Sequence, residues 1–221
     1  PSYTLFFYGR PFVPYSEYLR DRIRKKFGYD ILTFARSLFE ESEEAPRIRR
    51  EYYACANEQF LESYMGQYRA WCDAHGLKFT GHFGCEDTML EQVMVQGSVM
   101  AGYPYFTMPG IDKLQRPLEQ LVTVRQLTSA ARQLGDQRSL CECFAGIGHE
   151  SGFRKRKQIA DWLCLNGINF LNPHLTPYSL RGERKRDYPP ALGWQQPWWG
   201  EEEIFSAYLE RMCRLAALPE V

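Results

Sequence analysis

A lone carboxylate in an apolar segment is the residue of this sequence best suited to catalysis. Glu142 lies within residues 140–144, which are otherwise apolar. A carboxylate in such a segment is either buried and paired or directed into a site. In a site it can act as a nucleophile, a general base or a general acid. Glu142 is therefore the leading catalytic candidate, and a salt bridge to a neighbouring strand is the structural alternative.

A second acidic pair follows another short β-rich segment. Glu86 and Asp87 come after residues 77–83 and a glycine, so Glu86 is the candidate for the second catalytic carboxylate and Asp87 for a substrate contact. The alternative is that they cap the next helix. His82 and His174 also stand near strand ends, and their spacing carries no metal-binding signature. For both we expect hydrogen bonds to substrate rather than metal ligation.

These residues share a position, since each lies where a predicted strand ends. Asp112 follows Pro109-Gly110, and Asn172 precedes His174. In α/β barrels and open α/β sheets the site lies at the carboxyl ends of the strands, because the neighbouring loops converge there. The pattern therefore predicts one site at that edge. The alternative is that loops are polar wherever they occur.

A charged, proline-rich segment, residues 178–199, is predicted to form the wall of that site. Aromatic faces beside fixed charged groups suit sugar rings, because the ring stacks and its hydroxyls form hydrogen bonds. A solvated charge run, with tryptophans that pack the loop, is the alternative. The predicted sugar contacts are Tyr178, Arg184, Arg186, Asp187, Trp198 and Trp199.

The elements that must position these residues alternate between helix and strand. Hydrophobic periodicity, caps and glycines predict helices over 16–27, 30–40, 46–76, 88–100, 117–134, 154–166 and 201–218. Strands are predicted over 77–83, 103–108, 138–144 and 168–171, with 3–8 as a possible fifth. Such alternation requires parallel strands with right-handed crossovers. Both an open doubly wound sheet and part of a (β/α)8 barrel fit, and no phosphate-binding glycine motif follows a strand.

Composition excludes several classes of protein. Lys plus Arg and Asp plus Glu number 27 each, so the formal net charge is zero, unlike the basic excess of a typical nucleic-acid binder. No apolar run has the length of a membrane span, and residues 1–10 lack a signal-peptide pattern. Hydrophobic residues make up 44%, which is enough for a core. The seven cysteines are an odd number without a C-x-x-C pair, so most are expected to be buried small hydrophobes, and the compartment stays open.

Several short motifs resemble the catalytic barrel of large bacterial glycoside hydrolases, especially the family 106 α-L-rhamnosidases and their relatives. The motifs are WCDAHGL at 71–77, PGID at 109–112, ECFA at 142–145 and RKRDYPP at 184–190. The resemblance implies a (β/α)8 barrel, paired strand-end carboxylates and hydrolysis of a terminal deoxysugar, with calcium nearby. It also implies an inverting mechanism, in which the two carboxylates stand roughly 6.5–9.5 Å apart.

The chain also departs from that family. Its members are far longer, carry β-sandwich modules and have barrel strands before the point where this sequence starts. Cys141 stands where relatives often have serine. We therefore expect residues 1–221 to form the C-terminal part of one barrel domain, inert alone and partnered by the missing strands and modules. A non-catalytic carbohydrate-binding segment is the competing interpretation. A weaker third one is an α/β module that binds an anionic ligand through Arg181, Arg184 and Arg186.

Overall fold

The computed structural model describes residues 12–114, 120–135 and 138–218. The chain divides into two compact units, one of Pro1–Phe79 with Gly84–Phe106 and one of Thr80–Phe83 with Thr107–Val221. The assignment of residues 1–221 to one partial barrel domain stays a prediction. Within the described ranges no helix is both long and apolar enough to cross a membrane.

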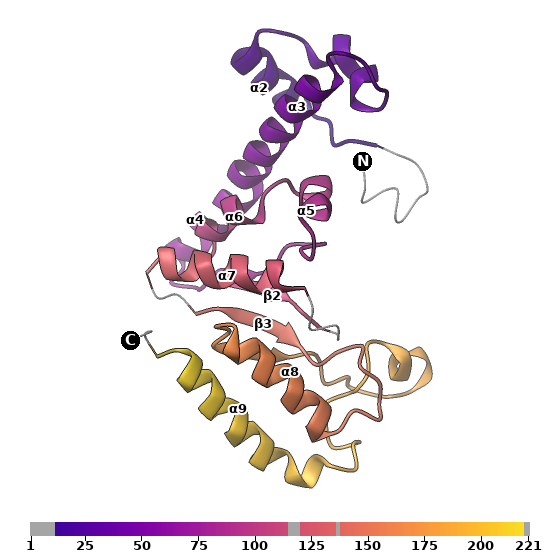
Figure 1. Ribbon diagram of the computed structural model, residues 1–221, viewed down its shortest axis with the longest axis vertical. Helices are drawn as coiled ribbons and strands as arrows, with labels where there is room; N and C mark the ends of the chain where they lie inside the picture. The colour runs from indigo at the N-terminus through magenta and orange to yellow at the C-terminus, as the bar shows by residue number, and fades with distance from the viewer. Residues whose placement is uncertain (1–11, 115–119, 136–137, 219–221) are drawn as a thin grey trace. The chain divides into compact units, whose positions relative to one another are not determined.

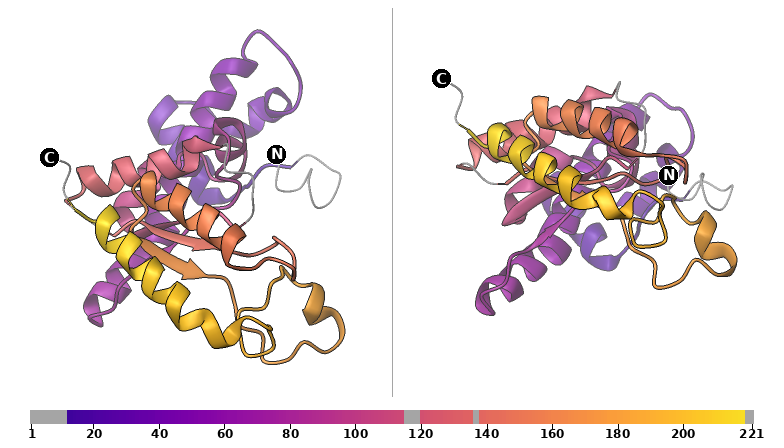
Figure 2. Two further views of the ribbon diagram at one scale, coloured as in Figure 1. Left: turned by 60° about the horizontal axis from the view of Figure 1, so that its bottom comes forward. Right: turned by 90° about the horizontal axis from the view of Figure 1, so that it is seen from below.

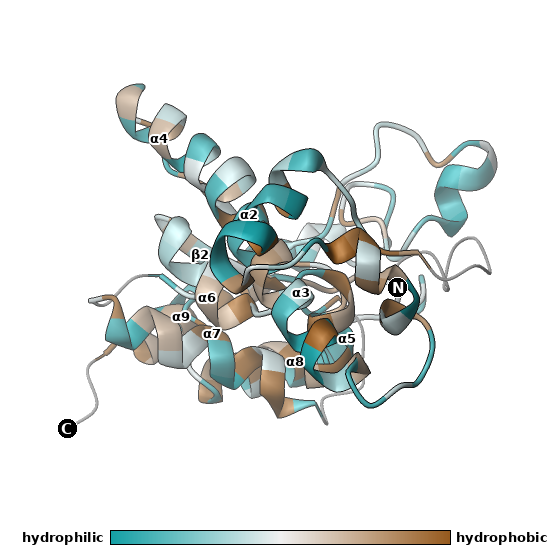
Figure 3. Cartoon of the chain, turned by 90° about the horizontal axis from the view of Figure 1, so that it is seen from above, coloured by the Kyte–Doolittle hydropathy of each residue, from teal (hydrophilic) through white to brown (hydrophobic). Residues whose placement is uncertain are grey.

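The first unit begins with a short helical core. Helix α2 (Glu17–Phe27) starts at Ser16, whose hydroxyl accepts a hydrogen bond from the Leu19 amide, and ends at Gly28 with φ 80°. The predicted helix over 30–40 is a 3₁₀ helix, η1 (Ile31–Leu38), capped by Asp30 as expected. Figure 3 shows α2 as mostly hydrophilic, so its few apolar side chains carry the packing. The buried cluster comprises Leu19, Ile23, Ile31, Leu38, Ile48, Tyr52 and Cys55.

The long helix predicted over 46–76 is continuous but not uniform. It consists of α3 (Ala45–Phe60), the π-helical turn η2 (Leu61–Gly66) and α4 (Gln67–Ala74). The aromatic stripe on it is buried only before the π turn. Tyr52 is 1% exposed, whereas Tyr64, Tyr68 and Trp71 are about half exposed. A π turn holds one extra residue and rotates the helix face, so the stripe leaves the core at that point.

Two sequence predictions between residues 88 and 112 are wrong. The helix over 88–100 is broken into α5 (Met89–Val95) and α6 (Val99–Gly102) by Gly97, whose φ is 96° and where a Cβ would lie 2.6 Å from the Asn57 Cβ. The strand over 103–108 is instead the 3₁₀ turn η3 (Tyr103–Tyr105), which has proline in its first turn. The strand β2 (Met108–Asp112) comes later and contains Pro109-Gly110 rather than stopping there.

The second unit contains a parallel sheet. Its described strands are β1 (Thr80–Gly81), β2, β3 (Leu140–Cys143) and β4 (Phe170–Pro173), which lie in that order. Gly110 is required in β2, because a Cβ there would lie 2.8 Å from the Gly81 carbonyl oxygen. The predicted strands over 77–83, 138–144 and 168–171 are thus confirmed with shorter or shifted bounds. The possible strand over 3–8 lies outside the described residues.

The order of the four described strands is compatible with part of a barrel, although one half of a doubly wound sheet also has strands in chain order. A complete doubly wound sheet reverses its order, whereas β1 to β4 follow the chain without reversal. Right-handed crossovers then place α7 (Leu121–Gln133) and α8 (Phe153–Leu165) on one side of the sheet. Helix α9 (Glu202–Ala216) packs beside α8, as both views of Figure 2 show. The arrangement, also visible in Figure 1, is compatible with part of a β/α barrel.

The two faces of the sheet differ in burial. Ile111, Cys141 and Cys143 alternate with the polar strand-end residues and are fully buried. Burial raises the pKa of the Cys143 thiol well above its usual value. All seven cysteines are free thiols, and five are buried, as the sequence predicts. The opposite face is only half-buried at Leu140 and Glu142, so it is the face that can receive a ligand.

A buried ion pair holds the start of α8 to the start of α9. The Arg156 guanidinium is 1% exposed and donates to both Glu202 carboxylate oxygens, at 2.9 and 2.6 Å. Its faces meet the rings of Trp198 at 4.1 Å and Phe205 at 4.5 Å. The segment between β4 and α9, which includes η4 (Gly182–Arg186) and η5 (Trp199–Glu201), is therefore anchored at its far end.

Candidate active site

Polar side chains form a row across the carboxyl ends of three strands. In the strand register Asp112 pairs with Glu142, and Glu142 pairs with Asn172. Residues paired across parallel strands lie on the same face of the sheet. The main chain continues the pairing past the row, since the Lys113 amide donates to the Glu142 carbonyl at 3.0 Å. Three of the predicted site residues are therefore neighbours.

His82 approaches this row from β1. Its Nε2 lies 3.9 Å from the Asp112 Oδ2 and 3.8 Å from the Glu142 Oε2. Its Nδ1 lies 2.9 Å from the Phe83 carbonyl oxygen, which can only accept, so Nδ1 carries a proton and Nε2 faces the carboxylates. Distances of 3.8–3.9 Å exceed a hydrogen bond and leave room for a bridging group such as a water or a substrate hydroxyl.

The cluster is open to its surroundings. The side chains of His82, Asp112 and Glu142 are 38%, 32% and 24% exposed. Among the described residues, Glu142 meets no lysine or arginine, so the salt-bridge alternative from the sequence has no partner of that kind. A partly exposed carboxylate beside an imidazole can transfer a proton to or from a bound molecule.

The same three side chains could hold a metal ion. Their ligand atoms all lie within 4.8 Å of one another. Imidazole with carboxylates suits zinc or manganese, whereas calcium takes six to eight oxygen ligands. The two carboxylates alone supply fewer oxygens than calcium takes, so the calcium that the family resemblance implies would need carbonyl groups or waters as further ligands.

The structure does not place Glu86 in this row, because Glu86 belongs to the first unit. It is 5% exposed, and its carboxylate adds to burial in raising the pKa of the neighbouring Tyr103 phenol. Asp87 is half-buried in the same unit. The helix cap there is Thr88, whose hydroxyl accepts a hydrogen bond from the Glu91 amide at 3.2 Å, so the capping alternative for the acidic pair is wrong. The pairing of Glu86 with Glu142 stays a prediction.

Four predicted sugar contacts from the segment after β4 line one hollow of about 230 Å³. They are His174, Tyr178, Arg184 and Asp187, joined by Tyr188. Arg186 lies at a neighbouring depression with Glu183. Trp198 instead stacks on the Arg156 guanidinium, and Trp199 is 43% exposed in η5. The packing alternative thus accounts for one face of Trp198, and sugar contact by Trp198 and Trp199 stays a prediction.

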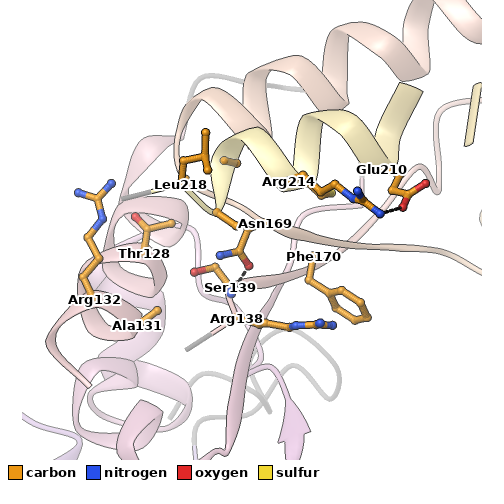
Figure 4. Close-up of a pocket in the computed structure, with 14 residues that line it drawn as sticks. Thr128, Ala131, Arg132, Arg138, Ser139, Asn169, Phe170, Glu210, Arg214 and Leu218 are labelled. Carbon is orange, nitrogen blue, oxygen red and sulfur yellow. Dashed lines mark hydrogen bonds and ion pairs between the residues drawn. The ribbon is translucent and has the colours of Figure 1, made fainter. Parts of the chain in front are cut away.

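A larger hollow, of about 800 Å³, lies at the opposite end of the sheet (Figure 4). Arg132, Arg138 and Arg214 surround it, together with Ser139 and Asn169. It is formed at the amino ends of β3 and β4, where the helices end. In β/α architectures that end serves stability, and the chemistry takes place at the carboxyl ends.

Sequence reasoning missed two features. It predicted one site at the strand ends, but not that His82 approaches the carboxylates of both Asp112 and Glu142. The predicted strand over 103–108 ended before Asp112, so the sequence did not show that Asp112 pairs with Glu142 in the sheet. It also missed the burial of Arg156, because an arginine at this position of the predicted helix is typical of an exposed surface residue. The acidic start of α9 was the available hint of a partner.

Comparison with known proteins gives a likeness in structure without one in sequence. No family model matches the chain. A search of curated proteins finds no relative either. Among solved structures, the rhamnosidase from Novosphingobium sp. PP1Y is similar, with a TM-score of 0.75 and 14% sequence identity over 93% of this chain. The chain corresponds to 21% of that protein's length. At this identity the likeness shows a fold shared with that part of the solved protein, and the fold alone.

Proposed function

We propose that this chain supplies part of the active site of a glycoside hydrolase that cleaves a terminal deoxysugar of the α-L-rhamnoside kind. The observation that carries the proposal is the cluster of Asp112, Glu142 and His82 at the carboxyl ends of parallel strands, on the half-buried face of the sheet. This is where β/α enzymes perform their chemistry. The solved structure to which the chain is similar is itself described as a rhamnosidase, which supports the substrate class.

In this proposal Glu142 is the general base of an inverting reaction. A water held between Nε2 of His82 and the two carboxylates attacks the anomeric carbon, and its proton passes to Glu142. The bond to the leaving oxygen breaks as the new bond forms. Asp112 and His82 orient the water, and the amide of Asn172, next in the row, contacts a sugar hydroxyl.

Asp112 does not serve as the acid in this proposal. Its carboxylate lies within 4.8 Å of that of Glu142, whereas the acid and base of an inverting enzyme stand roughly 6.5–9.5 Å apart, on opposite sides of the sugar. The proton for the leaving oxygen must therefore come from another wall. Glu86 remains the proposed donor, and further barrel strands and β-sandwich modules of a longer protein remain proposed partners.

The strain in the chain just after Glu142 is further support. Phe144 has φ 71° and is fully buried. A bulky residue in this region costs about 1–3 kcal/mol and persists where the surroundings fix it, which is frequent at active sites. The strained residue holds the direction in which the chain leaves β3.

The test is the substitution Glu142→Gln, which keeps the shape and removes the base. In the full-length protein the catalytic rate on an aryl α-L-rhamnoside should fall by about three orders of magnitude or more, with the melting temperature nearly unchanged. Glu203→Gln, at an exposed carboxylate on α9, is the matched control and should retain full activity. Turnover by the Glu142→Gln variant at the control's rate would refute the assignment.

A segment that binds carbohydrate without turnover is the second candidate. It is favoured by one observation, that the row in the second unit contains no carboxylate at the spacing of an inverting partner among its described residues. Titration with L-rhamnose separates the two. Binding with no detectable hydrolysis, in the longest available form of the protein, would favour this candidate over the enzyme.

A further inference from the structure

A second place for a sugar lies one step beyond the carboxylate row. The hollow of about 230 Å³ after β4 is lined by His174, Tyr178, Arg184, Asp187 and Tyr188. The lining combines two phenol rings with a cation and a carboxylate, which is the mixture that stacks a sugar and binds its hydroxyls.

The backbone fixes where this hollow stands relative to Glu142. Asn172 pairs with Glu142 in the register, and His174 is two residues further along the same strand direction. The His174 amide donates to the Cys143 carbonyl at 2.8 Å, so the pairing of β3 and β4 extends to His174. Alternate residues of a strand share a face and are separated by about 6.6 Å. His174 therefore lies on the same face as Glu142, about one sugar ring further on.

The wall of the hollow is held by hydrogen bonds rather than being a loose loop. The Pro189 carbonyl accepts from the amides of Ile147, at 2.9 Å, and Gly148, at 3.2 Å. The Thr176 hydroxyl donates to the Leu192 carbonyl. The His174 ring lies 5.7 Å from that of Tyr188, tilted by 50°. The segment that follows β4 is thus held by hydrogen bonds to the turn after β3, and β3 is the strand that contains Glu142.

The charged groups of the hollow are available to a ligand. Among the described residues, neither Arg184 nor Asp187 takes part in an ion pair, although both line the hollow. An arginine beside a carboxylate offers donors and an acceptor together, which matches neutral hydroxyl groups better than a single anion. Tyr178 is 97% exposed and Tyr188 is 49% exposed, so both rings retain surface for stacking.

We propose that this hollow is the subsite for the sugar residue joined to the one that is cleaved, so that the protein acts on a rhamnosyl oligosaccharide. The inference rests on the proposed function for the identity of the first sugar. It adds that Arg184, Asp187 and the two tyrosines recognise a neutral second ring on the leaving-group side.

The test compares two substrates in the same protein. The ratio of kcat/KM for an α-L-rhamnosyl disaccharide to kcat/KM for an aryl α-L-rhamnoside should fall about tenfold in Arg184→Ala and in Asp187→Asn. Lys185→Ala is the matched control, since this neighbouring cation does not line the hollow. Melting temperatures confirm that the variants are folded. An unchanged ratio in both variants would overturn the subsite.

A binding measurement separates this proposal from the proposed hydrolysis. Calorimetric titration of the Glu142→Gln protein should show tighter binding of the disaccharide than of L-rhamnose, and Arg184→Ala should remove that difference. If the disaccharide binds more tightly than L-rhamnose but the native protein shows no turnover, the subsite is supported and the proposed hydrolysis is refuted. Equal affinities for the two sugars would refute the subsite whatever the turnover.

Discussion

The two ends of the parallel sheet carry opposite kinds of site. At the carboxyl ends a small group of acidic and imidazole side chains faces an open surface. At the amino ends the hollow is larger, about 800 Å³, and lined by arginines. There Arg214 pairs with Glu210, and the Arg138 guanidinium lies 5.2 Å from the Phe170 ring. The volume of the hollow therefore favours the amino ends as the functional site, whereas the types of side chain favour the carboxyl ends.

The electrostatics of the helices explain the difference. Helices that return antiparallel to the strands end at the amino edge of the sheet, where their dipoles are negative and basic side chains are favourable. Arg132 and Arg214 stand in the last turns of α7 and α9. The arginines of the larger hollow thus complement helix ends, whereas Asp112 and Glu142 lie on strands and not in a helix turn. The volume of a hollow is therefore a weaker guide to function than the side chains that line it.

The largest expected effect concerns the ion pairs at the two ends. Glu202→Gln leaves the Arg156 charge buried without its partner and should lower the free energy of unfolding by about 3–5 kcal/mol. Glu210→Gln at the amino end breaks a pair whose side chains are 78% and 61% exposed, and should cost less than about 1 kcal/mol. Urea denaturation of both variants measures this. Equal losses would mean that the Arg156 pair does not anchor the carboxyl-end wall.

The next effect concerns activity. His82→Gln removes the Nε2 that faces Asp112 and Glu142, and should lower kcat on an aryl α-L-rhamnoside by about 100-fold. Arg138→Gln, in the amino-end hollow, should leave kcat within about twofold. Steady-state kinetics with both variants decide between the ends. A large loss in Arg138→Gln, with native stability, would move the chemistry to the larger hollow.

The smallest effect is a difference in thiol reactivity. The Cys164 thiol donates to the Cys213 sulfur, which lowers the pKa of Cys213 to about 7, whereas burial and neighbouring carboxylates raise the pKa of Cys85. A lowered pKa means more thiolate at neutral pH, so alkylation of Cys213 should rise as the pH passes through about 7, before that of Cys85.

Mass spectrometry after brief iodoacetamide treatment measures the two sites. Because Cys213 lines the amino-end hollow, its alkylation should also leave turnover unchanged. Faster labelling of Cys85 than of Cys213 at pH 7 would contradict the lowering of the Cys213 pKa by the hydrogen bond from Cys164. Inactivation that follows the labelling of Cys213 would break the contrast between the two ends.

Periodicity and caps predicted helix bounds in both units and the polar strand ends of the second. Ser16, Gly28 and Gly167 mark helix bounds through local geometry, which a sequence carries directly. The start of β2 was wrong because Pro109-Gly110 is typical of a turn, and only the close approach of the Gly81 carbonyl explains a glycine inside the strand. One site at the strand ends could be predicted, but the pairing of Asp112 with Glu142 depends on that register and could not be.

Other features depended on tertiary contacts that no local pattern specifies. The π turn η2 releases an aromatic stripe that periodicity alone assigns to the core. Arg156 is buried because Glu202 and the rings of Trp198 and Phe205, all far along the chain, surround it together with the nearby ring of Phe153. Glu86 was paired with Glu142 on strand-end position alone, and that criterion does not distinguish residues of the two units.

The most direct test of the account is to locate L-rhamnose bound to the protein by crystallography of the Glu142→Gln variant. We predict that the sugar ring lies at the carboxyl ends of β1 to β4, with its hydroxyls within hydrogen-bonding distance of His82, Asp112 and Asn172. A ring bound among Arg132, Arg138 and Arg214 at the amino ends, with the carboxyl-end cluster empty at saturating sugar, would contradict the central claim.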